Sequence, residues 1–239
     1  AGGWRRLTGD EVGALLGEQA AELAAFTGTG ILANSIVSSR LLRRIAQAHG
    51  LGHRNALPGS KWVSRVPGLV FGYEEALGYC VDPASVRDKD GIATSVVAAS
   101  LVAALKAQGR SVWDELERLA RLHGLHVSSP LTFRVEQIEQ IASGMARLRA
   151  QPPSVLAGSP VVEVSDLSQG YRGLPPTDGV LVLTEAGDRV IARPSGTEPK
   201  LKCYLEVILP VAEGEPLPWE QAHERLDAIK AAFAEIIGL

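Results

Sequence analysis

The sequence predicts an α/β protein, in which a three-layer domain built on a mixed sheet is followed by a smaller α+β domain. Strand-like and helix-like segments alternate over roughly the first 125 residues, which is typical of a doubly wound α/β domain. Further along, short strands joined by tight turns precede one long helix. The chain has 239 residues, of which 46% are hydrophobic and 21% charged. This length and composition suit a folded protein of two domains.

The first elements follow from capping and apolar patterns. Thr8 and Glu11 form a capping box, so a helix is expected to begin near residue 9. The apolar, β-branched segment 30–37 predicts a buried parallel strand. A helix over 39–49 should follow it and end at Gly50.

The next segments continue the alternation. Residues 70–73 predict a short strand that ends in a glycine turn. Asp90 should cap a long helix over 91–106. Ser111 should cap another helix that ends near Gly124.

A boundary is expected at Gln151-Pro152-Pro153, because prolines continue a helix poorly. We therefore predict domains over 1–150 and 151–239. An extended piece at 131–135 and a linking helix over 136–149 close the first domain. The second should contain strands at 161–164, 180–184, 189–192 and 201–209 and a helix over 219–237.

Composition excludes several function classes. The net charge of −3 offers no basic surface for nucleic acid, and no run of about 18 apolar residues predicts a membrane span. Cys80 and Cys203 lie far apart without CxxC spacing, and the histidines show no ligand spacing, so no metal site is expected. We expect a cytoplasmic location, and because the chain begins without Met, a fragment or a processed chain.

The segment from Arg193 to Lys202 has the composition of a phosphate cradle. A guanidinium can bind phosphate bidentately, hydroxyls donate to it, and glycine lets backbone amides turn toward it. Lysines two apart on a strand share a face. The alternative interpretation is a basic-edged hairpin with solvated lysines. The candidate phosphate-binding residues are Arg193, Ser195, Gly196, Thr197, Lys200 and Lys202.

A second group of charged residues follows the strand at 70–73. Glu74 and Glu75 lie in a glycine-flanked loop at the carboxyl end of that strand, where α/β sheets bind ligands. Their carboxylates can accept hydrogen bonds from sugar hydroxyls. Arg87 and Lys89 can bind phosphate or pair with these carboxylates. The alternative is a surface loop of paired charges.

These motifs resemble those of the α-D-phosphohexomutase family, which includes phosphoglucomutases and phosphomannomutases. Residues 193–200 resemble the phosphate-binding loop of its last domain. Residues 72–78 and 87–91 resemble the sugar-specificity loop and basic segment of its third domain. Residues 58–62 resemble another loop of that domain, in which Lys61 would contact the substrate. The alternative is that Trp62 packs in the core and Lys61 is solvated.

The resemblance implies that the chain is a C-terminal piece covering domains 3 and 4 of such an enzyme. Glu74, with Glu75 beside it, would contact sugar hydroxyls. Lys89 would lie near the reacting phosphate and support proton transfer, and Arg87 would help to hold its charge. The 193–202 segment would hold the nonreacting phosphate. Many phosphoglucomutases have Ser where this chain has Ala76, so the glucose or mannose preference does not carry over.

The family reaction moves phosphate between the C1 and C6 (or C5) hydroxyls of a hexose or pentose phosphate, through a phosphoserine and a bisphosphate intermediate. The chain has no Thr-Ala-Ser-His-Asn-Pro serine loop and no Asp-x-Asp-x-Asp-Arg loop for Mg²⁺. The resemblance therefore implies that the N-terminal half of the same enzyme supplies the serine and the Mg²⁺ ligands, with a glucose 1,6-bisphosphate-type activator. The piece alone is expected to be inactive. The alternative function is a non-catalytic phosphosugar-binding module.

Overall fold

The computed structural model describes residues 4–196 and 198–238 and divides into two compact units, Ala1–Gly124 and Leu125–Leu239. This division lies earlier in the chain than the boundary expected at Gln151. The reason is pairing: strand β5, Leu125–Arg134, runs antiparallel to β10 along its whole length. Helix α6, Ile138–Ala150, packs against α7 of the second unit. Both elements therefore belong to the second unit.

The sheet of the first unit is mixed. Its strand order is β2-β1-β3-β4, in which β1 pairs in parallel with β2 and β3, and β4 runs antiparallel to β3. The strands predicted at 30–37 and 70–73 are β1 and β3. The sequence analysis missed β2 because it is polar and β4 because it is short. The bounds are β1 Ile31–Ser35, β2 Gly52–Ala56, β3 Leu69–Glu74 and β4 Gly78–Cys80.

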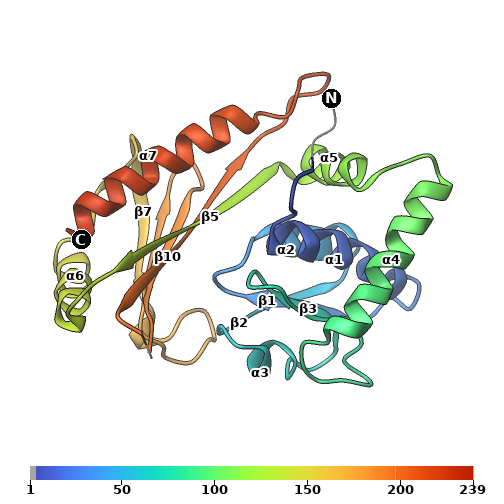
Figure 1. The fold of residues 1–239 in the computed structure, drawn as a ribbon, viewed down its shortest axis with the longest axis horizontal. Helices are drawn as coiled ribbons and strands as arrows, with labels where there is room; N and C mark the ends of the chain where they lie inside the picture. The colour runs from blue at the N-terminus through green and yellow to red at the C-terminus, as the bar shows by residue number, and fades with distance from the viewer. Residues whose placement is uncertain (1–3, 197, 239) are drawn as a thin grey trace. The chain divides into compact units, whose positions relative to one another are not determined.

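Helices cover this sheet unequally. Leu32 and Phe71 belong to a large core with residues of α1, α2 and α5, whereas Ala33 and Val63 belong to a small cluster beside the short α3. Figure 1 shows α1 and α2 side by side against the sheet. The mixed α/β class is confirmed, with α3 as the helix of the third layer. The helices are α1 Gly9–Ala25, α2 Leu41–Ala48, α3 Ser60–Val63, α4 Gly91–Ala107 and α5 Val112–His123.

The predicted caps hold these helices in place. Thr8 and Glu11 form the capping box of α1, and Ser111 and Asp114 form that of α5. The Asp90 carboxylate caps α4. In the described part of the chain no single helix is long and apolar enough to cross a membrane, and only the bent pair of α4 and α5 passes on length and composition.

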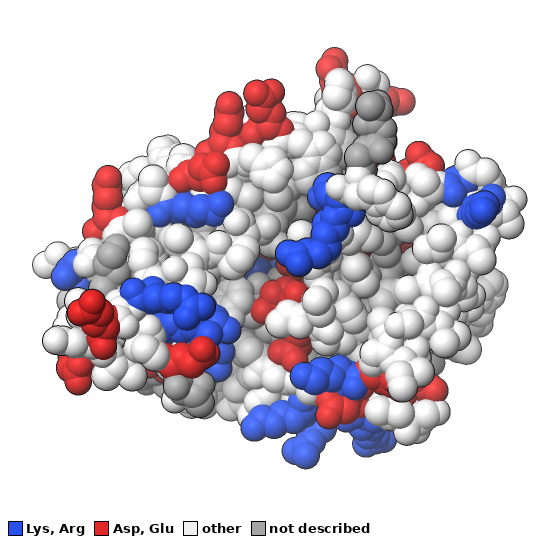
Figure 2. Space-filling model, in the orientation of Figure 1, with Lys and Arg blue, Asp and Glu red and all other residues white. Residues whose placement is uncertain are grey.

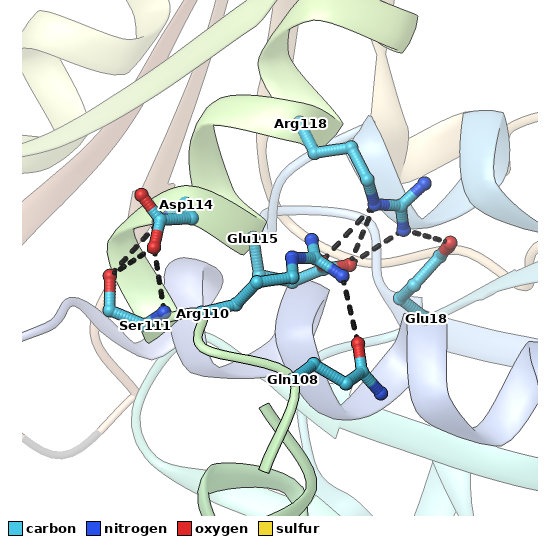
Figure 3. Close-up of polar contacts among 7 residues, drawn as sticks. All are labelled: Glu18, Gln108, Arg110, Ser111, Asp114, Glu115 and Arg118. Atoms are coloured by element: carbon cyan, nitrogen blue, oxygen red, sulfur yellow. Dashed lines mark hydrogen bonds and ion pairs between the residues drawn. The ribbon is translucent and has the colours of Figure 1, made fainter. Parts of the chain in front are cut away.

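A charge network ties α5 to α1 (Figure 3). The Arg118 guanidinium donates to Glu115 on its own helix at 2.6 Å and to Glu18 of α1 at 2.5 Å. Arg110 also pairs with Glu115. Burial favours the neutral form of Glu115, but the two guanidinium groups prevail and lower its pKa. The network fixes the helical layer on which the sheet rests.

The second unit is a six-stranded antiparallel sheet with two helices. The strand order is β5-β10-β9-β8-β7-β6. Helix α7, Trp219–Ile237, has the bounds that the sequence predicted, and it packs on β10 and β5 (Figure 1). A short 3₁₀ turn, η1, spans Leu167–Gln169. The remaining strands are β6 Val155–Leu156, β7 Ser159–Asp166, β8 Val180–Thr184, β9 Arg189–Pro194 and β10 Lys200–Leu209.

The two faces of β10 differ in chemistry. Leu201, Cys203 and Leu205 are buried and apolar. Because side chains alternate along a strand, Lys200 and Lys202 lie on the opposite face. The alternation places a basic, partly exposed face at the start of β10, next to the turn that follows β9.

Candidate functional site

Three loops of the first unit meet at the carboxyl end of β3. The backbone N–H of Gly59 donates to Glu74 Oε1 at 2.5 Å, which ties the 58–62 loop to the carboxylate loop. A hydrogen bond from Ser60, followed by one from the Lys89 backbone, lowers the pKa of Asp88. The 58–62 segment therefore contacts both charged segments that the sequence singled out.

Glu74 and Lys89 line one small pocket above Gly78. A Cβ added at Gly78 would lie 3.5 Å from Lys89 Cδ and 3.8 Å from Glu74 Oε2. The missing side chain thus leaves a space that the Lys89 stem and the Glu74 carboxylate border. A carboxylate and an ammonium at one pocket can accept hydrogen bonds from hydroxyls and attract a phosphate, respectively.

Glu75 is held from within the first unit. Its Oε2 accepts a hydrogen bond from the Ser38 hydroxyl at 2.8 Å, and its backbone N–H donates to Ser38 Oγ at 3.1 Å. Burial, together with the charges of Asp10 and Glu74, raises the pKa of Glu75 against the opposing effect of Ser38. The hydrogen bonds between this partly buried glutamate and Ser38 hold the carboxylate loop in position.

The N-terminus of α1 supports the same loop. Tyr73 Oη donates to Asp10 Oδ1 at 2.9 Å, and the Ser39 N–H donates to the same oxygen at 2.8 Å. A Cβ at Gly9 would lie 1.9 Å from the Glu75 carbonyl oxygen, so only glycine allows this approach. Sequence reasoning missed these supports, although Tyr73, flanked by Gly72 and Glu74 at a strand end, was a usable signal.

Arg87 lies elsewhere on the first unit's surface, and Lys61 lies beside Trp62. Arg87 is exposed and lines a separate groove with Arg65 and Asp82, so it does not share the pocket of Glu74 and Lys89. Lys61 Nζ lies 5.9 Å from the ring centroid of Trp62. The Trp62 side chain is 43% exposed, so the alternative that it packs in the core is wrong.

The candidate cradle is the hairpin turn between β9 and β10. The backbone N–H of Ser195 donates to the Lys200 carbonyl at 2.9 Å, which closes the turn. Arg193 lies directly opposite Lys202 in the register of the two strands. Nothing lies within 4 Å of a Cβ added at Gly196, so the glycine leaves open space over the turn. Thr197, also predicted to bind phosphate, lies outside the described residues.

The charges of the cradle are unevenly paired. Lys200 pairs with Glu198, and this pair, with the nearby charges of Arg134 and Lys202, lowers the pKa of Glu198. Among the described residues, the side chains of Arg193 and Lys202 make no ion pair or hydrogen bond. Figure 2 shows Lys and Arg side chains gathered over the end of β5 and the start of β10, which contain Arg134, Lys200 and Lys202. This end of the sheet can attract an anion.

Across residues 4–196 and 198–238, no three His, Cys, Asp or Glu side chains are grouped closely enough to hold a metal ion. Cys80 and Cys203 are both free and buried. Burial raises the pKa of both thiols, that of Cys203 to about 12.

Comparison with known proteins gives consistent matches along the chain. Residues 8–122 match phosphoglucomutase/phosphomannomutase, alpha/beta/alpha domain III, and residues 133–236 match the phosphoglucomutase/phosphomannomutase C-terminal domain. A probable phosphomannomutase of Haemophilus influenzae is 41% identical over 86% of this chain and 41% of its own length. A human phosphopentomutase is 30% identical over 98% of this chain and 43% of its own length.

Solved structures agree on the fold. A putative phosphomannomutase from Thermus thermophilus superposes with a TM-score of 0.66 at 20% identity, over 97% of this chain and 41% of that one. The chain spans about two fifths of the length of the curated relatives it matches, as the 41% and 43% shares state.

Proposed function

The chain belongs to the phosphoglucomutase/phosphomannomutase family, and on this premise we propose that it supplies the sugar and phosphate recognition of a phosphosugar mutase. One observation carries the proposal. At the β9–β10 turn, Arg193 and Lys202 lie opposite each other and, among the described residues, make no side-chain ion pair or hydrogen bond. Two neighbouring cations whose side chains make no ion pair or hydrogen bond among the described residues suit a ligand phosphate.

The proposed reaction moves phosphate between the C1 and C6 (or C5) hydroxyls of a hexose or pentose phosphate. In this scheme the turn with Arg193, Ser195 and Lys202 holds the phosphate that does not react. The planar guanidinium offers two parallel N–H donors, and the Ser195 hydroxyl and the lysine add further donors. Holding one end of the sugar fixes the distance of the other end from the reacting group.

We assign the sugar hydroxyls to Glu74. One of its oxygens is engaged by the Gly59 amide, and Glu74 lines the small pocket at Gly78. A carboxylate that already has one fixed hydrogen bond keeps its position when a sugar arrives, which lowers the entropy cost of binding. Glu75, bonded to Ser38, holds the loop in place and needs no direct contact with the sugar.

Lys89 is assigned to the reacting phosphate. Its stem lies beside Gly78 near Glu74, and Lys89 and Glu74 line the same pocket. A positive charge there would stabilise the charge that develops during phosphoryl transfer. Arg87 lines a different groove and would act by attracting the phosphate over a longer range.

The phosphoserine, the Mg²⁺ ligands and the glucose 1,6-bisphosphate-type activator belong, in this proposal, to the complete enzyme with its N-terminal half. The described residues of this chain group no three metal-binding side chains. In this proposal the chain by itself binds phosphosugars without turning them over.

Calorimetric titration tests the proposal. The chain is titrated with glucose 1-phosphate, mannose 1-phosphate and ribose 1-phosphate, alongside Arg193→Ala and the control Arg54→Ala. Arg54 is an exposed strand arginine of the first unit, so it controls for the loss of one positive charge.

We expect Arg193→Ala to weaken binding of all three sugars about 100-fold, since a bidentate charge-assisted contact is lost. The thermal unfolding midpoint should change little, because the Arg193 side chain makes no hydrogen bond or ion pair with another described residue. Equal affinity in wild type and Arg193→Ala would overturn the proposal, and so would a failure of the wild-type chain to bind any of the three.

A further inference from the structure

Arg134, the last residue of β5, lies beside the cradle, because Lys200 of β10 is its antiparallel partner. We propose that Arg134 is a further phosphate-binding residue, which holds the sugar phosphate from the β5 side while Arg193 holds it from the β9 side. The inference rests on the proposed function and extends it by one named contact. It also predicts that the cradle prefers a dianionic phosphate.

The register of the sheet places Arg134 on the same face as the cations of the cradle. Lys200 of β10 is the direct antiparallel partner of Arg134, and Lys202 is the partner of Arg193 on the other side. Directly opposed residues in an antiparallel pair point to the same face of the sheet. The four cations therefore share one face, with β10 in the middle and one arginine on each flanking strand.

A backbone contact fixes Arg134 against the turn. The N–H of Val135 donates to the carbonyl of Pro199 at 3.1 Å, so the chain leaving β5 is bonded to the residue that precedes β10. This bond lies at the level of the Lys200–Arg134 pair. The arginine is therefore anchored at its backbone while its side chain is exposed.

The charges around Arg134 are a second, independent observation. Glu198 lies close enough to Arg134 for the arginine to contribute to lowering its pKa. Yet the carboxylate pairs with Lys200, and the Arg134 side chain makes no ion pair or hydrogen bond among the described residues. Among the described residues, Arg134, Lys200, Lys202 and Arg193 share this face, and Glu198 pairs with one of them, Lys200, in a chain whose net charge is −3.

Such a concentration of like charge is favourable only with an anion nearby. A phosphate monoester has three terminal oxygens and carries nearly two charges above its second pKa of about 6. Two guanidinium forks on opposite sides can bind different oxygen pairs of one phosphate, which a single arginine cannot do. The dianion therefore gains more from Arg134 than the monoanion does.

The test is an NMR titration of the intact chain with inorganic phosphate, following the side-chain N–H signals of arginine. Wild type, Arg134→Ala, Arg134→Lys, Arg193→Ala and the control Arg54→Ala are compared at pH 5 and pH 7.5. We expect Arg134→Ala to weaken binding about tenfold at pH 7.5 and less at pH 5. Arg134→Lys should recover the salt dependence and part of the affinity, because it keeps the charge and loses the fork.

The outcomes separate this inference from the proposed function. If Arg193→Ala abolishes binding while Arg134→Ala binds as wild type does, the inference is wrong and the cradle stands. If wild type does not bind phosphate, or binds it equally well after Arg193→Ala, both are wrong. A tenfold loss in Arg134→Ala, with a shifted Arg134 signal in the wild-type titration and an unchanged Arg54→Ala, supports the inference.

Discussion

The carboxylates of the first unit and the cations of the second are prepared for ligands in opposite ways. Glu74 and Glu75 accept hydrogen bonds from Gly59 and Ser38. Arg193 and Lys202, by contrast, have no side-chain partner among the described residues. A carboxylate that distinguishes similar sugars benefits from a fixed position. A cation that attracts a phosphate benefits from having no side-chain partner that competes with the phosphate.

The largest expected effect comes from a substitution that disturbs only the carboxylate loop of the first unit. Gly9→Ala places a Cβ where the Glu75 carbonyl lies 1.9 Å away, so α1 or the carboxylate loop must move. We expect a loss of about 3 kcal/mol in stability, measured by thermal and urea unfolding. Gly91 begins α4 as Gly9 begins α1, and nothing lies within 4 Å of its added Cβ, so Gly91→Ala is the matched control.

Binding of inorganic phosphate should survive Gly9→Ala at temperatures where the second unit remains folded, since the cradle lies on β5, β9 and β10. If Gly91→Ala destabilises the chain as much as Gly9→Ala does, the close approach of α1 to Glu75 has no special role.

A smaller effect is expected when the carboxylate beside the cations of the cradle is removed. Glu198→Gln removes the carboxylate that pairs with Lys200. With this competitor gone, we expect the dissociation constant of inorganic phosphate to fall about threefold in a calorimetric titration at low salt. Glu213→Gln, at an exposed loop position of the same unit, controls for net charge. Weaker binding in Glu198→Gln would indicate that this carboxylate organises the turn for the ligand.

The smallest effect concerns pH and the carboxylate loop. Burial raises the pKa of Glu75 above its value in the unfolded chain, so the folded state takes up a proton first as the pH falls. Its contribution to stability is therefore largest at low pH and decreases as pH rises through the folded pKa. The stability of wild type relative to Glu75→Gln should increase between pH 7 and pH 4, measured by urea unfolding. A constant difference would show that Glu75 is not perturbed.

Local signals predicted the longer helices well. The capping boxes at Thr8 and Ser111 and the bounds of α7 are confirmed, because caps and periodicity act within a few residues. The polar strand β2 and the position of the unit boundary were not predicted, because both depend on pairing between distant segments. The positions of Arg134 and Ser38 near the candidate site were not predicted for the same reason, because their partners lie far away in the sequence.

Hydrogen exchange of the intact chain with and without saturating glucose 1-phosphate tests the central claim most directly. Amides at the end of β9 and the start of β10 should gain strong protection, because the phosphate supplies the partner that the cradle lacks. Amides of Glu74 and Glu75 should change less, since their loop is already bonded to Gly59 and Ser38. Protection that appears in the carboxylate loop and is absent from β9 and β10 would contradict the account.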